Sequence, residues 1–330
     1  MKKKQTLILS RKIIEKLINM KNAMCSVEEA FRAHASLKGI MPSKVYLNLP
    51  KQQGDFRAMP AYLEGINRAV VKWVNVHPNN KRIGLPTVMA VMILSDPANG
   101  FPLCIMDGTY ATNLRTGAAG GIAAKYLANK KSSVVALVGC GEQALTQLLA
   151  LNENFKIKEV RVWGYQKPLL DQFLRRTRHL HFSMKGYLDV KSCVSSADII
   201  VTTTPSRKPL VQYEWLKAGV HINAIGADAK GKQELDIKIL KKSKVVIDDW
   251  DQSSHSGEIN VAVSKGQITR KDIYGLLGDI IIHKKQGRIH PKEITVFDST
   301  GLGIQDVAVA HLIYETAVKR HVGKWMNLVI

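Results

Sequence analysis

A short segment joining an apolar run to a helical pattern constrains the fold of this chain more than any other feature. Residues 134–144 read VVALVGCGEQA, in which an apolar strand leads into Gly139, Gly141 and Ala144. The first glycine permits a tight turn, the second lets a ligand approach the backbone, and the small Ala144 lets the next helix pack closely. A helix beginning at this turn directs its positive end toward a bound phosphate. The segment therefore predicts a dinucleotide-binding turn.

Strands and helices alternate along the part of the chain that contains this turn. The predicted strands are the apolar runs 133–138, 159–163, 199–203, 221–225, 244–248 and 294–297. Helical periodicity is found between them, at 142–151 and 168–179, and before them at 115–128. This alternation predicts an α/β fold, with a Rossmann-type doubly wound parallel sheet.

Residues 1–110 have a different pattern, typical of a mixed α+β domain. The predicted strands here are 6–10, 45–49, 70–76, 88–94 and 103–107, with helices at 13–24 and 27–34. Turn sequences between the strands predict antiparallel pairing. Because Val45, Leu47 and Leu49 alternate with polar residues or tyrosine, we expect the strand 45–49 to bury one face.

The change of pattern sets the expected domain boundaries. The closing helix, 306–319, is expected to pack back on the first domain. We therefore expect one domain of residues 1–118 and 304–330, and a dinucleotide-binding domain of residues 119–303.

The chain carries a large excess of positive charge. It contains 48 Lys and Arg residues against 27 Asp and Glu, a formal net charge of +21. Such an excess favours anionic partners, including a dinucleotide, a carboxylate substrate or nucleic acid. The cations are spread along the chain, however, without the interleaved aromatic residues that single-strand binders use. We therefore expect a solvated basic surface and no nucleic-acid partner.

The cysteines and the hydropathy pattern favour a cytoplasmic protein. Cys25, Cys104, Cys140 and Cys193 form no C-x-x-C motif, and we expect them to be reduced, buried, small apolar residues. The apolar run after the N-terminal lysines is too short for a signal peptide, and no run of ~18 apolar residues predicts a membrane span. The ten histidines show no paired spacing, so no metal is predicted.

The expected residue for the adenosine ribose is missing. In an NAD site an acidic residue usually closes the second strand, ~20 residues after the glycine turn, and binds the ribose 2′-hydroxyl. The segment 163–167, WGYQK, contains no acid, and Lys167, Arg175 and Arg176 follow. NAD is the expected cofactor, and NADP remains an alternative.

Four cations in the first domain are candidates for binding a carboxylate substrate. Lys72 lies inside the apolar segment VVKWVNV, where a lysine is costly unless it has a partner. Lys44, Arg57 and Arg115 lie in apolar or turn-rich settings, and arginine binds a carboxylate in bidentate fashion. A lysine close to other cations has a lowered pKa and can transfer protons. The alternative is that these are scattered surface cations of a basic protein.

Six motifs together resemble the ornithine cyclodeaminase/mu-crystallin family, and within it most closely the archaeal-type alanine dehydrogenases. They are LPTVMA (85–90), RTGAAGGIAAKYLA (115–128), TTTPSRKP (202–209), INAIGADAKGKQELD (222–236), GEINVAVSKG (257–266) and DSTGLGIQDVA (298–308). The resemblance covers almost the whole chain. It implies a two-domain homodimer whose first domain binds substrate and forms the dimer. The implied reaction is NAD-linked oxidative deamination of L-alanine, or a similar small amino acid, to the 2-oxo acid and ammonia.

The resemblance also implies a role for particular residues. Lys72 would be the catalytic acid or base, and Asp228 would position the attacking water or the ammonia. Lys44, Arg57 and Arg115 would bind the substrate. The phosphate loop would consist of Gly139, Cys140, Gly141, Glu142, Gln143 and Ala144. The residues along the cofactor would be Thr203, Thr204, Pro205, Ser299 and Thr300.

Three positions bear on the substrate and its reaction. In ornithine cyclodeaminases, the position three residues before the proline that matches Pro60 resembles a glutamate that binds the distal amine of ornithine. In this sequence that position is Arg57. A cation there repels a second ammonium and favours a small neutral or an acidic side chain, which indicates alanine or another short amino acid rather than ornithine, lysine or arginine. Asp228 follows the strand 221–225, where parallel sheets bind ligands, although a turn-capping role is the alternative. Lys230 replaces an expected proline and would add a cation beside Asp228.

Three alternatives to a dehydrogenase remain open at this point. An ornithine cyclodeaminase would use NAD without net redox change and release proline and ammonia. A ketimine reductase would run in the reducing direction with NADPH. A mu-crystallin-like protein would bind the cofactor and a small ligand without catalysis, but the presence of Lys72 and Asp228 argues against it.

Overall fold

The computed structural model describes residues 4–329, which divide into two compact units. Unit 1 comprises the chain up to Arg115 together with the segment from Leu302 onward, and unit 2 comprises Thr116–Gly301. Helix α3 (Gly108–Leu127) begins in unit 1 and continues into unit 2. None of the helices in this part of the chain combines the length and apolar character needed to cross a membrane.

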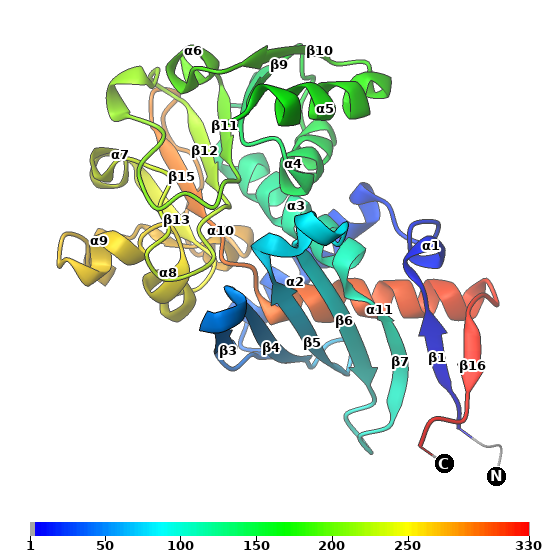
Figure 1. The fold of residues 1–330 in the computed structure, drawn as a ribbon. Helices are drawn as coiled ribbons and strands as arrows, with labels where there is room; N and C mark the ends of the chain where they lie inside the picture. The colour runs from blue at the N-terminus through cyan, green and yellow to red at the C-terminus, as the bar shows by residue number, and fades with distance from the viewer. Residues whose placement is uncertain (1–3, 330) are drawn as a thin grey trace. The chain divides into compact units, whose positions relative to one another are not determined.

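Unit 2 is built on a parallel sheet, as the alternation of strands and helices predicts (Figure 1). Its strands lie in the order β10-β9-β8-β11-β12-β15-β13-β14. Their bounds are Val134–Val138 (β8), Glu159–Trp163 (β9), Ser183–Tyr187 (β10), Ile199–Thr202 (β11), His221–Ala224 (β12), Lys244–Ile247 (β13), Gly275–Leu276 (β14) and Thr295–Asp298 (β15). The chain runs outward from β8 to β10 and then returns to β11 on the other side. This reversal makes the topological switch point at which doubly wound sheets bind ligands.

The helices of unit 2 cover both faces of this sheet. Their bounds are Glu142–Asn152 (α4), Lys167–Thr177 (α5), Val190–Val194 (α6), Ile237–Lys242 (α7), Trp250–Ser256 (α8), Asn260–Ser264 (α9) and Leu277–Ile281 (α10). Strand residues alternate between the two cores: Leu137 packs with Leu148 of α4 and Phe173 of α5, whereas Ala136 packs with Ile239 of α7. Sequence reasoning missed β10 and β14, which are edge strands without a fully buried residue.

Unit 1 contains a largely antiparallel sheet in the order β16-β1-β7-β6-β5-β4-β2, with β3 also pairing with β4. The bounds are Thr6–Leu9 (β1), Gly39–Ile40 (β2), Val45–Leu49 (β3), Gly54–Leu63 (β4), Arg68–Val76 (β5), Val88–Ser95 (β6), Pro102–Asp107 (β7) and Lys324–Met326 (β16). Helix α11 (Gly303–Lys319) lies on β4, β5 and β6 and also contacts α2 (Met20–Ala35) (Figure 1). The closing helix therefore packs on the first part of the chain, as predicted.

The longest strand of this sheet, β4, was missed because it contains Pro60. A proline cannot donate a hydrogen bond and usually argues against a central strand. Here Pro60 lies between the stretch of β4 that pairs with β3, residues 54–58, and the stretch that pairs with β2, residues 62–63. The missing donor therefore falls where β4 has no partner on that side among the described residues.

The prediction that β3 buries one face is wrong. Val45 is 63% exposed and Leu47 50% exposed. They belong to an apolar face of the sheet that also includes Trp73 of β5 and Val91 of β6, which are 45% and 47% exposed. Alternation identified the strand, but it could not show whether another part of the same chain covers the apolar side.

Two smaller expectations also need correction. The predicted helices 13–24 and 27–34 are instead a short helix α1 (Arg11–Ile14) and the continuous α2, which begins after its N-cap Asn19. The Asn19 side chain accepts a hydrogen bond from the backbone of Asn22, which fixes that start. Cys104 and Cys193 are buried as expected, but Cys25 is exposed.

Candidate active site

The site in unit 1 is built around a buried lysine. Lys72 of β5 is 1% exposed, and its Nζ lies 2.8 Å from Oδ2 of Asp306 on α11. The other carboxylate oxygen of Asp306 accepts a hydrogen bond from Nε of Arg115 at 3.1 Å, and the Arg115 guanidinium also donates to Gln305 Oε1 at 3.0 Å. The structure thus joins two of the predicted residues, Lys72 and Arg115, through one carboxylate.

This environment makes Lys72 suitable for proton transfer near neutral pH. Burial, then the nearby positive charges of Arg115 and Lys44, lower the pKa of Lys72 from 10.5 to about 7, against the opposing effect of Asp306. The Lys72 ammonium carries three donors, and its ion pair with Asp306 at 2.8 Å can occupy only one of them. Buried donors need partners, and a substrate nitrogen or carboxylate can supply one.

Arg57 lies on the same buried face of the sheet as Lys72. Arg57 pairs across the strands with Val74, and Lys72 pairs with Met59. The Arg57 guanidinium binds Asp55 with both Nε (2.7 Å) and Nη2 (3.2 Å). Asp55 therefore offsets much of the Arg57 charge, which weakens the argument that Arg57 repels a diamino acid.

Sequence reasoning missed Asp55, Gln305 and Asp306. Asp306 carried a detectable signal, because a carboxylate within the apolar helical sequence GIQDVAVA must be paired if that face is buried. Its partner Arg115 lies 191 residues away in the sequence, so the pairing could not be inferred from local spacing.

The glycine turn of unit 2 has the geometry that the sequence predicts. Gly139 follows β8 with φ of +120°, and a Cβ there would lie 2.6 Å from Oγ1 of Thr203. Gly141 is the N-cap of α4, and a Cβ there would have no neighbour within 4 Å. Ala144 is completely buried against the sheet. The turn therefore leaves open space at the N-terminus of an 11-residue helix, where a pyrophosphate can bind.

The charged residues around this turn are partly paired. Glu142, in the first turn of α4, forms an ion pair with Arg176 of α5. Lys167 forms an ion pair of 2.7 Å with Asp171 one turn further along α5. Two of the three cations that raised the alternative of NADP therefore have carboxylate partners. Cys140 of the turn is half-buried, and its Sγ would lie 3.2 Å from a Cβ added at Gly164.

Buried hydroxyl groups lie at the carboxyl ends of β11 and β15. Oγ1 of Thr203 and Oγ of Ser299 are buried and lack a hydrogen-bond partner in the described part of the chain. Thr300 is held by Asp248, which accepts hydrogen bonds from its backbone (2.6 Å) and its hydroxyl (2.9 Å). Hydroxyls without partners at this edge of the sheet fit a polar cofactor bound there.

A series of buried carboxylates holds the loops at this edge. Glu234 accepts hydrogen bonds from the backbone of Thr204 (2.6 Å) and Gly226 (3.0 Å), Glu258 from the backbone of Glu234 (2.8 Å), and Asp298 from the backbone of Glu258 (2.9 Å). Burial raises the pKa of Glu234 to about 7. Burial and the charge of Glu234 raise the pKa of Glu258 well above its ordinary value. Sequence reasoning assigned these acids no role.

Asp228 lies in the loop after β12, at the carboxyl edge of the sheet. The cation paired with it is Lys232, four residues on, rather than Lys230. Lys230 is exposed, and its backbone carbonyl accepts a hydrogen bond from Arg207 at 3.2 Å. Pro205 is exposed in the loop after β11.

The parallel sheet, its switch point and the glycine turn define unit 2 as a dinucleotide-binding domain of the Rossmann class. The profile of the ornithine cyclodeaminase/mu-crystallin family matches residues 4–321. The chain belongs to this family, which confirms the assignment made from its motifs. In residues 4–329, no three His, Cys, Asp or Glu side chains are grouped to hold a metal ion.

Individual relatives agree with this assignment. The chain is 54% identical over 321 residues to an alanine dehydrogenase of Archaeoglobus fulgidus, covering 97% of each protein. It is similar to the solved structure of an archaeal alanine dehydrogenase dimer with bound NAD, with 53% identity, a TM-score of 0.93 and coverage of 98% of this chain and 99% of that one. It is also similar to a Δ1-pyrroline-2-carboxylate reductase of Thermococcus litoralis in complex with NADH and L-proline, with 36% identity, a TM-score of 0.94 and coverage of 97% and 99%.

Proposed function

We propose that this protein is an NAD-dependent alanine dehydrogenase, which converts L-alanine reversibly to pyruvate and ammonia. The observation that carries the proposal is the buried group of Lys72, Asp306 and Arg115, in a chain that also contains a dinucleotide-binding turn. The identity of 54% to an alanine dehydrogenase supports alanine as the substrate.

The residues of unit 1 would bind and deprotonate the substrate. Arg115, with Lys44 and Arg57, would fix the substrate carboxylate, which limits the orientations of Cα. Lys72 would exchange a proton with the amino or imino nitrogen, because its pKa of about 7 makes both protonation states accessible. Asp306 would keep the Lys72 side chain in place. Asp228 of unit 2 would orient the water that attacks the imine or the ammonia that is released.

The residues of unit 2 would hold the cofactor. NAD, when bound, supplies the hydride acceptor. Residues 139–144 would bind its pyrophosphate at the N-terminus of α4. The residues expected along the ribose and nicotinamide are Thr203, Thr204, Pro205, Ser299 and Thr300. The buried hydroxyls of Thr203 and Ser299 support this assignment, because each lacks a partner within the described residues.

The proposal includes a homodimer formed through unit 1. An exposed apolar sheet face of the kind formed by Val45, Leu47, Trp73 and Val91 is unusual on a monomer and typical of an interface. A similar archaeal protein is a dimer. We also propose a cytoplasmic location, because all four cysteines are free, as expected in a reducing compartment.

The test is the absorbance at 340 nm of purified protein supplied with NAD or NADP and one amino acid at a time. We expect NADH to form with alanine and not with ornithine or lysine. Proline and ammonia formed from ornithine without a change in absorbance would instead establish a cyclodeaminase. Oxidation of NADPH by a cyclic imine, with no activity on alanine, would establish a ketimine reductase. NAD binding without turnover of any of these compounds would favour a non-catalytic binding protein.

A further inference from the structure

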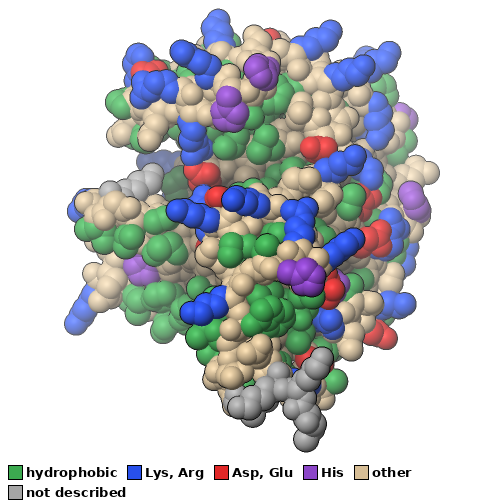
Figure 2. All heavy atoms as spheres, turned by 90° about the vertical axis from the view of Figure 1, so that its right-hand side faces the viewer, with side chains coloured by type: hydrophobic (Ala, Val, Ile, Leu, Met, Phe, Trp, Pro, Cys, Tyr) green, Lys and Arg blue, Asp and Glu red, His purple; other side chains and the backbone are tan. Residues whose placement is uncertain are grey.

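A buried glutamate joins two loops at the carboxyl edge of the parallel sheet. The first loop follows β11 and contains Thr204, and the second follows β12 and contains Gly226. One carboxylate oxygen of Glu234 accepts a hydrogen bond from the Thr204 backbone at 2.6 Å, and the other accepts from the Gly226 backbone at 3.0 Å. Acidic side chains on the face shown in Figure 2 lie among lysines and arginines, whereas Glu234 is completely buried with backbone amides as partners.

The glutamate and the two loops are packed without spare room. A Cβ added at Gly226 would lie 2.3 Å from the carbonyl oxygen of Thr204 and 2.5 Å from Oε2 of Glu234. Even one methyl group at this position would therefore push the loops apart. Because both loops contact the same carboxylate, Glu234 sets the distance between them.

Glu234 is itself held by a series of buried carboxylates. Glu258 accepts hydrogen bonds from the backbone of Glu234 (2.8 Å) and of Leu235 (2.7 Å). Asp298 in turn accepts from the backbone of Glu258 (2.9 Å) and of Ile259 (3.2 Å). Asp298 is the last residue of β15, which lies inside the sheet between β12 and β13. The series therefore connects Glu234 to a rigid element of the fold.

The loop after β12 has a second anchor that does not involve Glu234. The buried side chain of Asn260 accepts a hydrogen bond from the Gly231 backbone at 2.8 Å and donates to the Lys232 carbonyl at 2.7 Å. Lys232 forms the ion pair with Asp228. These contacts of Asn260 act on the loop that carries Asp228, whereas the Glu234 carboxylate binds both loops.

We propose that Glu234 is a positioning residue, which places Asp228 relative to the residues along the cofactor. The inference rests on the proposed function, in which residues 203–205 lie along NAD and Asp228 orients the water or the ammonia. Glu234 would act through the backbones of the two loops. Loss of one carboxylate oxygen would leave a buried N–H without an acceptor, and the loop that carries it would move.

The experiment compares Glu234→Gln with two other variants of the whole protein. Glutamine has nearly the shape of glutamate, but its amide group would place a donor against one of the two backbone N–H groups. Asn260→Ala removes the anchor of the Asp228 loop alone. Glu293→Gln is the matched control, because Glu293 is also a carboxylate that holds a loop of unit 2.

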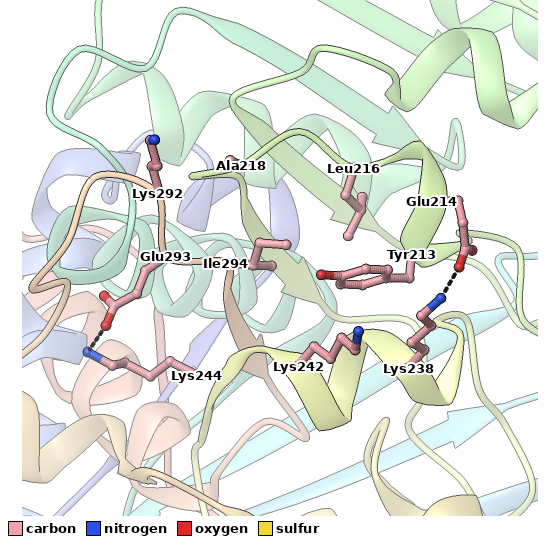
Figure 3. A pocket seen from close by; sticks show the side chains of 10 residues that line it. All are labelled: Tyr213, Glu214, Leu216, Ala218, Lys238, Lys242, Lys244, Lys292, Glu293 and Ile294. Atoms are coloured by element: carbon pink, nitrogen blue, oxygen red, sulfur yellow. Dashed lines mark hydrogen bonds and ion pairs between the residues drawn. The ribbon is translucent and has the colours of Figure 1, made fainter.

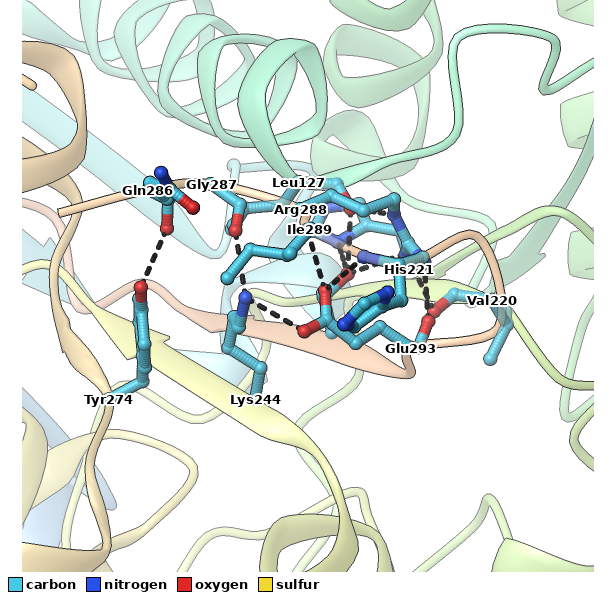
Figure 4. A network of polar contacts seen from close by, with 12 residues as sticks. Leu127, Val220, His221, Lys244, Tyr274, Gln286, Gly287, Arg288, Ile289 and Glu293 are labelled. Atoms are coloured by element: carbon cyan, nitrogen blue, oxygen red, sulfur yellow. Dashed lines mark hydrogen bonds and ion pairs between the residues drawn. The ribbon is translucent and has the colours of Figure 1, made fainter.

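The control residue lies at the opposite edge of the same sheet. Glu293 precedes β15, whereas Glu234 holds the loops that follow the parallel strands β11 and β12. Glu293 accepts a hydrogen bond from the backbone of Ile289 at 3.0 Å (Figure 4) and pairs with Lys244 at 2.9 Å (Figure 3). Its replacement shows what the loss of a loop-holding carboxylate does away from the cofactor edge.

Three quantities are measured for each protein: the Kd for NAD by fluorescence titration, kcat and KM for alanine at saturating NAD, and the midpoint of thermal unfolding. In Glu234→Gln we expect the Kd for NAD to rise and kcat to fall, each by about tenfold or more. In Asn260→Ala we expect kcat to fall by about tenfold while the Kd stays within about twofold of the wild type. Glu293→Gln should leave both quantities near their wild-type values.

Glu234→Asp is a second variant, which keeps the charge but shortens the reach toward the two loops. We expect it to show the same changes as Glu234→Gln. Wild-type values of Kd and kcat in either Glu234 variant would overturn the proposal. Equal losses in Glu293→Gln would also overturn it, because a general loosening of unit 2 would explain them. Wild-type protein that binds NAD without oxidising alanine would contradict the proposed function, whereas the Kd for NAD would still decide this inference.

Discussion

The role of a single residue could be predicted where a charged side chain, which costs free energy to bury, stood in an apolar segment. Lys72 was identified in this way, and the structure gives it a buried site with a lowered pKa. Its contact with Asp306 required the fold, since residues 72 and 306 meet only when α11 packs on β5.

Asp306→Asn is expected to shift the pH dependence of alanine oxidation. The Asp306 carboxylate favours the ammonium form of Lys72, so its removal lowers the pKa of Lys72 below about 7. If the neutral lysine is the active base, activity rises with pH through that pKa, and the rise moves to lower pH by about one pH unit. The measurement is kcat against pH for the variant and the wild type, so that the ionisation of the substrate cancels.

A matched control removes a charge from the same helix. Glu315→Gln deletes an exposed carboxylate of α11 that lies 3.5 Å from Arg68. We expect it to leave the pH profile unchanged. A midpoint that does not move in Asp306→Asn, in protein that still binds NAD, would mean that Lys72 is not the group that titrates.

At the scale of elements, periodicity predicted most strands but not what covers them. The parallel strands of unit 2 were found because both of their faces are buried, which produces continuous apolar runs such as Val135–Val138. In unit 1, the alternation in β3 revealed a strand but assigned its apolar side to the interior. Strand β4 was missed because of Pro60. A proline is compatible with that strand only because the neighbouring strands β2 and β3 leave its position unpaired, which the sequence does not show.

Two glycines of the turn between β8 and α4 allow the stability of the protein and its affinity for the cofactor to be tested separately. Gly139→Ala would place a Cβ 2.6 Å from Thr203 Oγ1 at a φ of +120°, and we expect it to cost about 1–3 kcal/mol of stability and to weaken NAD binding. Gly141 has a φ of −98° and free space at its Cβ position. Gly141→Ala should therefore leave the stability nearly unchanged but weaken NAD binding, because the methyl group occupies space needed by the pyrophosphate.

The two variants are compared by denaturant unfolding and by fluorescence titration with NAD. The Gly141 variant provides the sharper test, since its fold should be intact. Wild-type affinity for NAD in that variant would show that the pyrophosphate does not approach the backbone at this turn.

The sheet of unit 1 has an apolar face that the rest of the chain leaves exposed. Trp73 lies on the apolar sheet face, where its ring stacks on Phe56 with centroids 5.1 Å apart and planes inclined by 13°. This stacked pair forms part of a surface that includes Val45 and Val91. In the proposed homodimer, a second copy of the chain would cover this face. The interface would then bury the same residues of both subunits.

Trp73→Asp is expected to convert the dimer into a monomer. A carboxylate in the middle of an apolar interface would be buried without a partner, which costs several kcal/mol for each subunit. Light scattering after size-exclusion chromatography should give the 36.6 kDa mass of the chain for the variant and twice that mass for the wild type. Trp325→Asp is the control, because Trp325 is similarly exposed, at 42%, but lies on β16 at the other end of the sheet. If both variants remain dimeric, the subunits associate through another surface; if only Trp73→Asp dissociates, the apolar face of β3–β6 is the interface.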